Sequence, residues 1–140
     1  MSAILLIDDD PRMLAMIQRI LQSENYQVAT AASGALGLEL FRQLKPNLVI
    51  TDILMPDKDG IETLREIRNL DPHARIIAIS GGGRAKYRNF LEIAQEFGAT
   101  EVLEKPFRRE QLLTAVFRVL KGVSMARYRP HPGNDGRDKA

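Results

Sequence analysis

Five residues with reactive side chains stand just after short, largely apolar runs of this sequence: Asp8, Asp9, Asp52, Ser80 and Lys105. Clustered carboxylates bind Mg²⁺, a hard ion that takes oxygen ligands and keeps several of its waters. A single carboxylate can also act as a nucleophile and become an aspartyl phosphate. A lysine ammonium and a hydroxyl can then hold the phosphoryl oxygens while charge develops on them. These residue types therefore favour metal-assisted phosphoryl chemistry.

A run of three carboxylates, Asp8 to Asp10, follows the first apolar stretch. Like charges this close repel each other, and the cost grows where the site is partly desolvated. Asp10 also precedes Pro11 and an amphipathic segment, a position where aspartate caps a helix and proline occupies its first turn. We therefore predict that Asp8 and Asp9 bind a cation, while Asp10 caps a helix.

Short apolar runs alternate with longer segments of helical periodicity. The runs predict five strands: Ala3–Ile7, Gln27–Thr30, Leu48–Thr51, Ile76–Ser80 and Glu101–Leu103. Five helices are predicted from apolar residues at helical spacing: Met13 to Leu21, Leu36 to Leu44, Ile61 to Ile67, Tyr87 to Ala94 and Leu112 to Leu120. Gly98 and Gly122 stand where helix C-caps are expected, and Asp59 with Glu62 matches a capping box at the start of the third helix.

Five strands alternating with five helices indicate right-handed crossovers, and therefore an α/β fold with one doubly wound parallel sheet covered on both faces. In such folds ligands bind beyond the carboxyl ends of the strands. The five reactive residues all leave strands at that edge, so we expect them to meet there. Residues 1–122 are predicted to form one domain, and the polar, Pro- and Gly-rich residues 123–140 a flexible tail.

The composition excludes several classes of protein. The chain has 140 residues with 44% hydrophobic content, which suits the core of one domain, and it has no cysteine for a disulfide or a thiol site. No apolar stretch reaches the roughly 20 residues that span a bilayer, and no signal peptide is apparent. The 20 basic and 18 acidic residues are interspersed, so we expect a cytoplasmic protein that binds neither membrane nor nucleic acid. His73 and His131 are isolated and predict no metal site.

The motifs around the reactive residues resemble those of the response-regulator receiver domains of two-component signalling. The similarity runs from about Ala3 to Gly122 and rests on LLIDDDP, LVITDILMPDKDG, IIAISGG and EVLEKPF, in that order. Each motif alone is weak, but the order and spacing together are specific. The resemblance implies a flavodoxin-like receiver fold with strand order 2-1-3-4-5. It also implies a cis bond before Pro106.

The resemblance further implies a role for each residue of the predicted site. Asp52 would be the phosphoacceptor, with Ser80 and Lys105 assisting. Mg²⁺ would be the cofactor, with these ligands: Asp8 through water, Asp9 and Asp52 directly, and the backbone carbonyl of Leu54. Many receivers carry an aromatic residue three positions before the lysine, and its rotamer couples to phosphorylation. Val102 occupies that position, which puts the aromatic switch in doubt.

As a receiver, the chain would be a phosphorylation-controlled signalling switch and not an enzyme with a diffusible substrate. A sensor histidine kinase or a histidine phosphotransfer protein would donate the phosphoryl group. The face formed by the fourth helix, the fifth strand and the fifth helix would then change its affinity for a downstream protein. We expect a stand-alone receiver without a DNA-binding output domain. The sequence is compatible with both a monomer and a homodimer.

Three other classes of protein share part of this pattern. A haloacid-dehalogenase-type phosphatase has Asp-x-Asp after its first strand, but Arg12 stands where that family has Thr or Val, and no later acidic pair follows a strand. A flavodoxin-like flavin binder needs a first loop that cradles phosphate, which two aspartates would repel. A DNA-binding regulator needs a helix-turn-helix after the fifth helix, and the polar residues 123–140 predict none. We favour the receiver over all three.

Overall fold

A parallel sheet of five strands forms the middle layer of the computed structural model, which describes residues 2–53, 59–81, 96 and 98–122. The strand order is β2-β1-β3-β4-β5, as the resemblance implied. The strands are β1 (Ala3–Ile7), β2 (Gln27–Ala31), β3 (Leu48–Asp52), β4 (Ile76–Ser80) and β5 (Glu101–Glu104). Each predicted strand is confirmed to within one residue at its carboxyl end.

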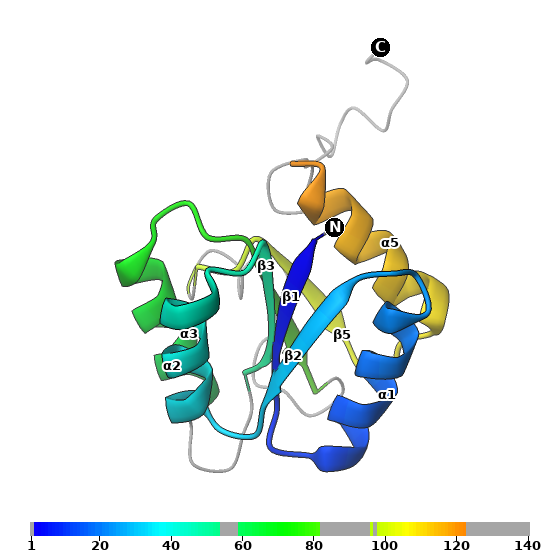
Figure 1. The fold of residues 1–140 in the computed structure, drawn as a ribbon, viewed down its shortest axis with the longest axis horizontal. Coiled ribbons are helices and arrows are strands. Elements are labelled where there is room, and N and C mark those ends of the chain that lie inside the picture. Colours follow the sequence, from blue (N-terminus) through cyan, green and yellow to red (C-terminus); the bar gives the residue numbers. More distant parts are fainter. Residues whose placement is uncertain (1, 54–58, 82–95, 97, 123–140) are drawn as a thin grey trace.

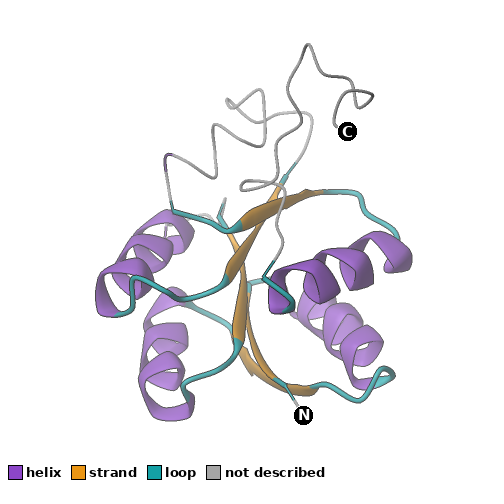
Figure 2. Ribbon diagram, turned by 90° about the horizontal axis from the view of Figure 1, so that it is seen from above, coloured by secondary structure: helices purple, strands orange, loops and turns teal. Residues whose placement is uncertain are grey.

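Helices cover both faces of the sheet (Figure 1). The described helices are α1 (Pro11–Gln22), α2 (Gly34–Leu44), α3 (Asp59–Leu70) and α5 (Arg109–Leu120). α1 and α5 lie on one side and α2 and α3 on the other, and the view from above separates the layers (Figure 2). None of these helices is long and apolar enough to cross a membrane. The predicted helix from Tyr87 to Ala94 and the predicted tail at 123–140 lie outside the described residues.

Local capping sets where the helices begin and end. Asp10 is the N-cap of α1, as predicted, because its Oδ1 accepts a hydrogen bond from Arg12 N at 2.9 Å. α5 ends before Gly122, whose φ of +90° lies in the left-handed region that favours glycine. α3 begins at Asp59, whose side chain is outside the described part, so its capping box with Glu62 stays a prediction.

The core has two layers, because successive residues of a strand point to opposite faces of the sheet. Ile4 and Leu6 pack with the apolar residues of α1 and α5, whereas Leu5 and Ile7 pack with those of α2 and α3. Every residue of β3 and β4 is buried. Packing from both sides therefore holds the ends of the central strands in place, and the reactive side chains emerge at those ends.

Candidate functional site

The carboxyl ends of four strands bring the predicted site residues to one edge of the sheet. Asp52 is the last residue of β3, and Ser80 is the last residue of its neighbour β4. Asp8 directly follows β1, the other neighbour of β3, and Lys105 directly follows β5. The backbone amide of Lys105 donates to the carbonyl oxygen of Ser80 at 2.8 Å, which extends the β4–β5 pairing to the lysine itself. The predicted convergence is therefore observed.

An ion pair joins two of these residues across the site. Lys105 Nζ donates to Asp52 Oδ2 at 3.1 Å. The Asp52 side chain is 8% exposed and the Lys105 side chain 28%, so the pair is screened less by solvent than a surface pair. The peptide bond between Lys105 and Pro106 is cis, as the resemblance implied. The ammonium thus offsets part of the repulsion among the carboxylates.

The Asp8 carboxylate is buried and only half satisfied. Its Oδ1 accepts a hydrogen bond from the backbone amide of Asp10 at 2.9 Å, but its Oδ2 has no hydrogen-bond partner within the described part of the chain. The pKa of this carboxyl is raised from 3.8 to about 6, chiefly by burial. The Asp10 amide and the Lys105 ammonium lower the pKa and the negative charges of Asp52 and Asp9 raise it, and the value of about 6 is the net result. A cation at Asp8 Oδ2 would relieve both the repulsion and the missing contact.

The donor set at this edge fits Mg²⁺. No three Asp, Glu, His or Cys side chains of the described ranges are grouped closely enough to hold a metal by themselves. Mg²⁺ does not require such a group, because it commonly keeps several waters and takes only one or two carboxylates. Asp8 and Asp52 supply carboxylate oxygens of that kind, and Asp9 lies exposed beside them. Leu54, the predicted carbonyl ligand, lies outside the described residues.

Comparison with known proteins assigns the chain to a family, because the model of the response regulator receiver domain matches residues 4–117. This chain belongs to that family. Protein CcdB of Bacillus subtilis is 37% identical over 121 residues, which cover 86% of this chain and 98% of that protein. Chemotaxis protein CheY of the same organism is 37% identical over 118 residues, which cover 84% of this chain and 96% of that protein. A crystal structure of a response regulator receiver domain protein from Clostridium thermocellum matches with a TM-score of 0.77 and 32% identity over 86% of this chain and 95% of that one.

Receiver domains belong to two-component response regulators, and phosphorylation at a site that uses Mg²⁺ is a general feature of the family. The predicted family, the α/β fold and the strand order of the receiver domain are therefore confirmed. The roles assigned to Asp52, Ser80, Lys105 and the metal ligands stay predictions.

Gly60 of the receiver domain lies against the backbone of Asp52 and Ile53, a close contact that the sequence motif alone did not reveal. A Cβ atom at this position would lie 2.2 Å from the carbonyl oxygen of Asp52 and 2.7 Å from Cα of Ile53. Both distances are far below any real carbon contact, so the first turn of α3 can pack against the end of β3 only with glycine there. The Asp-Gly pair in LVITDILMPDKDG was the signal in the sequence, although it did not indicate which atoms meet.

Val102 of the receiver domain is buried in the core layer that faces α2 and α3. It lies three residues before Lys105, where many receivers have an aromatic side chain. Valine is stiff at χ1 and has no ring to rotate. The structure thus gives no aromatic group at this position that could respond to changes at Asp52.

Glu101 is a buried acid that the sequence analysis did not single out. It is the first residue of β5, is 2% exposed, and accepts hydrogen bonds from the guanidinium of Arg118 on α5. Because it starts a strand, it lies at the sheet edge opposite to Asp52. The pair therefore attaches α5 to β5 and takes no part in the chemistry of the site. An acid at a strand start carries no local signal for burial.

Proposed function

We propose that this receiver domain is a phosphorylation-controlled signalling switch whose phosphoacceptor is Asp52. The observation that carries the proposal is the 3.1 Å contact of Lys105 Nζ with Asp52 Oδ2, beside an Asp8 oxygen that has no hydrogen-bond partner among the described residues. An ammonium held next to a nucleophilic carboxylate places positive charge where the oxygens of a transferred phosphoryl group would lie. The family match supports the same chemistry.

In the proposed reaction, a carboxylate oxygen of Asp52 attacks the phosphorus of a phosphohistidine on a partner protein. An O–P bond forms while the P–N bond to the imidazole breaks. The electron pair of that bond returns to the imidazole nitrogen, and the proton on the other ring nitrogen leaves the histidine neutral. The product is an acyl phosphate on Asp52, so no further co-reactant is consumed.

Lys105 and Ser80 would follow the phosphoryl group after transfer. The Lys105 ammonium would exchange its contact with Asp52 Oδ2 for one with a phosphoryl oxygen, and the Ser80 hydroxyl would donate to another. Ser80 ends β4, directly before the segment 81–100, and Lys105 follows β5, shortly before the start of α5. A shift of these two side chains can therefore bias the surface built from β5 and α5.

Asp8, Asp9, Asp52 and the carbonyl of Leu54 would hold Mg²⁺ in this proposal. When bound, the ion neutralises charge on the carboxylates and on the phosphoryl oxygens. The buried Asp8 Oδ2, which has no hydrogen-bond partner in the described ranges, supports the assignment, since an unsatisfied buried carboxylate is costly unless a cation or its water completes the contact.

The phosphoryl donor in this proposal is a sensor histidine kinase or a histidine phosphotransfer protein. The output is a changed affinity for a downstream protein at the face that includes β5 and α5. The domain would assist its own phosphorylation and dephosphorylation without turning over a diffusible substrate.

The proposal is tested by incubating the protein with Mg²⁺ and acetyl phosphate, followed by intact-mass measurement. We expect one added phosphoryl group, which hydroxylamine removes because it cleaves acyl phosphates. Asp52→Asn should stay unlabelled. Asp10→Asn is the matched control, because it makes the same change on a neighbouring acid while asparagine keeps the helix cap. Labelling of Asp52→Asn at the wild-type level would contradict the assignment.

A further inference from the structure

A groove of about 650 Å³ runs between β5 and α5. Its walls are residues 101–106 on one side and the face of α5 from Glu110 to Arg118 on the other. β5 is the last strand of the described sheet, so the groove follows a sheet edge whose outer backbone groups are not paired with another described strand. The groove therefore offers both side-chain and backbone partners to an extended segment.

Acidic side chains line this groove at both ends. At the end near the carboxyl terminus of α5, Glu101 is buried and paired with Arg118. At the other end, Glu104 and Glu110 are exposed. Glu110 has a 3.9 Å contact with Arg108, but both side chains are 78% exposed and such a pair contributes little. Among the described residues no ion pair involves Glu104. Within the described part of the chain, Glu104 and Glu110 therefore present one unpaired and one weakly paired carboxylate to cationic side chains at this end.

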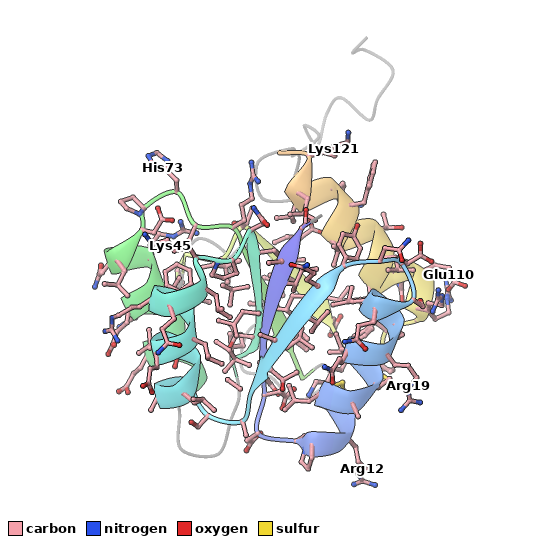
Figure 3. All side chains as sticks on the ribbon, in the orientation of Figure 1. Arg12, Arg19, Lys45, His73, Glu110 and Lys121 are labelled. Carbon is pink, nitrogen blue, oxygen red and sulfur yellow. The ribbon has the colours of Figure 1, made fainter. Side chains whose placement is uncertain are left out.

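α5 ends close to the Arg118 end of this groove, and Gly122 turns the backbone away from the helix axis. Gly122 adopts a φ of +90°, and its amide donates to the carbonyl oxygen of Val119 at 3.0 Å, which closes the helix with a change of direction. Figure 3 shows Lys121 and Glu110 at opposite ends of α5. The helix has 12 residues and is about 18 Å long, a distance that five or six extended residues cover at about 3.3 Å each. Residues 127–129 can therefore reach the acidic end.

The chemistry of that segment matches the groove. Arg127 and Arg129 flank Tyr128, and Pro130 follows. Arginine pairs readily with carboxylates at partly exposed sites, and tyrosine supplies an amphipathic ring that covers apolar surface. We propose that the segment Arg127–Arg129 docks in the groove between β5 and α5, with its two guanidinium groups at Glu104 and Glu110.

Docking would place the segment beside a residue of the phosphorylation site. Lys105 is one of the residues that line the groove, and its ammonium contacts Asp52. The segment would also occupy the face that the proposed function assigns to the downstream protein, so the two would compete. This competition rests on the proposed function, whereas the docking itself depends only on the groove and the segment.

The chain has no tryptophan, so Tyr128→Trp gives the full-length protein a single fluorescent reporter in the segment. We expect its emission to lie at a shorter wavelength than that of a solvated indole, and its quenching by acrylamide to be reduced. Glu104→Lys with Glu110→Lys in the same background should lower the ratio of docked to free segment by about fivefold or more, because two exposed charge pairs are lost and reversed. The emission should then shift towards that of solvated indole.

Two further variants separate docking from a general charge effect. Glu39→Lys with Glu66→Lys makes the same change at exposed sites on α2 and α3, on the opposite face of the sheet, and should leave the emission unaltered. Adding Arg127→Glu and Arg129→Glu to the groove variant exchanges the charges and should restore the docked emission.

Three outcomes would overturn the proposal, and none of them involves phosphorylation, so the test is independent of the proposed function. The first is a solvated tryptophan in every variant. The second is an equal response to the two pairs of glutamate substitutions. The third is a docked emission that disappears on dilution, since that would place the segment on a second copy of the chain.

Discussion

Lys105 Nζ and Asp52 Oδ2 lie 3.1 Å apart although the two residues are 53 positions apart in the sequence. Their strands are not neighbours, because β4 lies between β3 and β5. The lysine side chain therefore reaches across the end of β4 to contact the carboxylate. The ammonium therefore lies at one oxygen of the carboxylate that is the proposed phosphoacceptor.

Replacement of Lys105 by glutamine should slow phosphorylation without unfolding the domain. A charge-assisted hydrogen bond contributes about 1.5–3 kcal/mol, so the loss of the ammonium should reduce the rate by about 10- to 150-fold. The measurement is the initial rate of labelling by acetyl phosphate at saturating Mg²⁺. Lys121→Gln, which removes a charge at the opposite end of the molecule, should label like wild type. Equal rates for the two variants would exclude a role for Lys105 in transfer.

Mg²⁺ should stabilise the folded protein, because it binds the carboxylates only where the fold brings them together. At ten times the dissociation constant the gain is about 1.4 kcal/mol. For a domain of this size the melting temperature should rise by roughly 3–6 °C. Asp8→Asn should show a smaller rise in the same thermal melts. NaCl at equal ionic strength is the control, and an equal effect of NaCl on wild type would argue against a specific metal site.

Without metal, Asp8 should make the protein less stable as the pH rises from about 4 to about 6. Burial raises its pKa from 3.8 to about 6 in the folded state, so the folded protein binds more protons than the unfolded chain in this window. The free energy of unfolding therefore falls with rising pH, by at most about 3 kcal/mol at 1.36 kcal/mol per pKa unit. Asp8→Asn removes this titration. Urea unfolding in metal-free buffer should show wild type losing stability relative to Asp8→Asn across the window, and a gain instead would refute the prediction.

Asp10 should contribute to stability and not to metal binding. Its carboxylate caps α1 through Arg12 N, so Asp10→Ala should cost about 1 kcal/mol, whereas Asp10→Asn should be nearly neutral. Both variants should keep the melting shift that Mg²⁺ produces in wild type. Urea unfolding gives the cost, and loss of the metal response in Asp10→Asn would show that the third aspartate is a ligand.

Gly60→Ala should destabilise the domain more than Gly37→Ala. The new Cβ at position 60 would lie 2.2 Å from a backbone oxygen of Asp52, which can move only if α3 moves. At position 37 the closest atoms are Cδ1 and Cγ1 of Ile7 at 2.5 and 2.8 Å, and these side-chain atoms can shift more easily than backbone. Overpacking of this kind costs about 1–3 kcal/mol. Chemical denaturation of the two variants measures the difference, and an equal cost would mean that α3 adjusts freely.

The sequence by itself determined the strands, the first helix cap and the edge at which the site forms. Apolar runs such as ILLI are local signals for buried strands, and aspartate before Pro11 is a local signal for a cap. Because parallel strands share one carboxyl edge, the convergence of Asp8, Asp52 and Lys105 could be predicted without any distance. The strand order was available only from the resemblance to receiver domains, since periodicity does not indicate which strands are neighbours.

Only the tertiary structure decided how each charged group is surrounded. Asp8 is buried with one oxygen that has no partner within the described part of the chain, while the adjacent Asp9 is exposed, and the buried Glu101 pairs with Arg118 of the following helix. The close approach of Gly60 to Asp52 likewise depends on where α3 packs. The burial and the pairing of a side chain depend on the residues that surround it in space, and most of these are far away in the chain. Propensity and periodicity describe only neighbours along the chain, so they could locate these residues but not determine their environments.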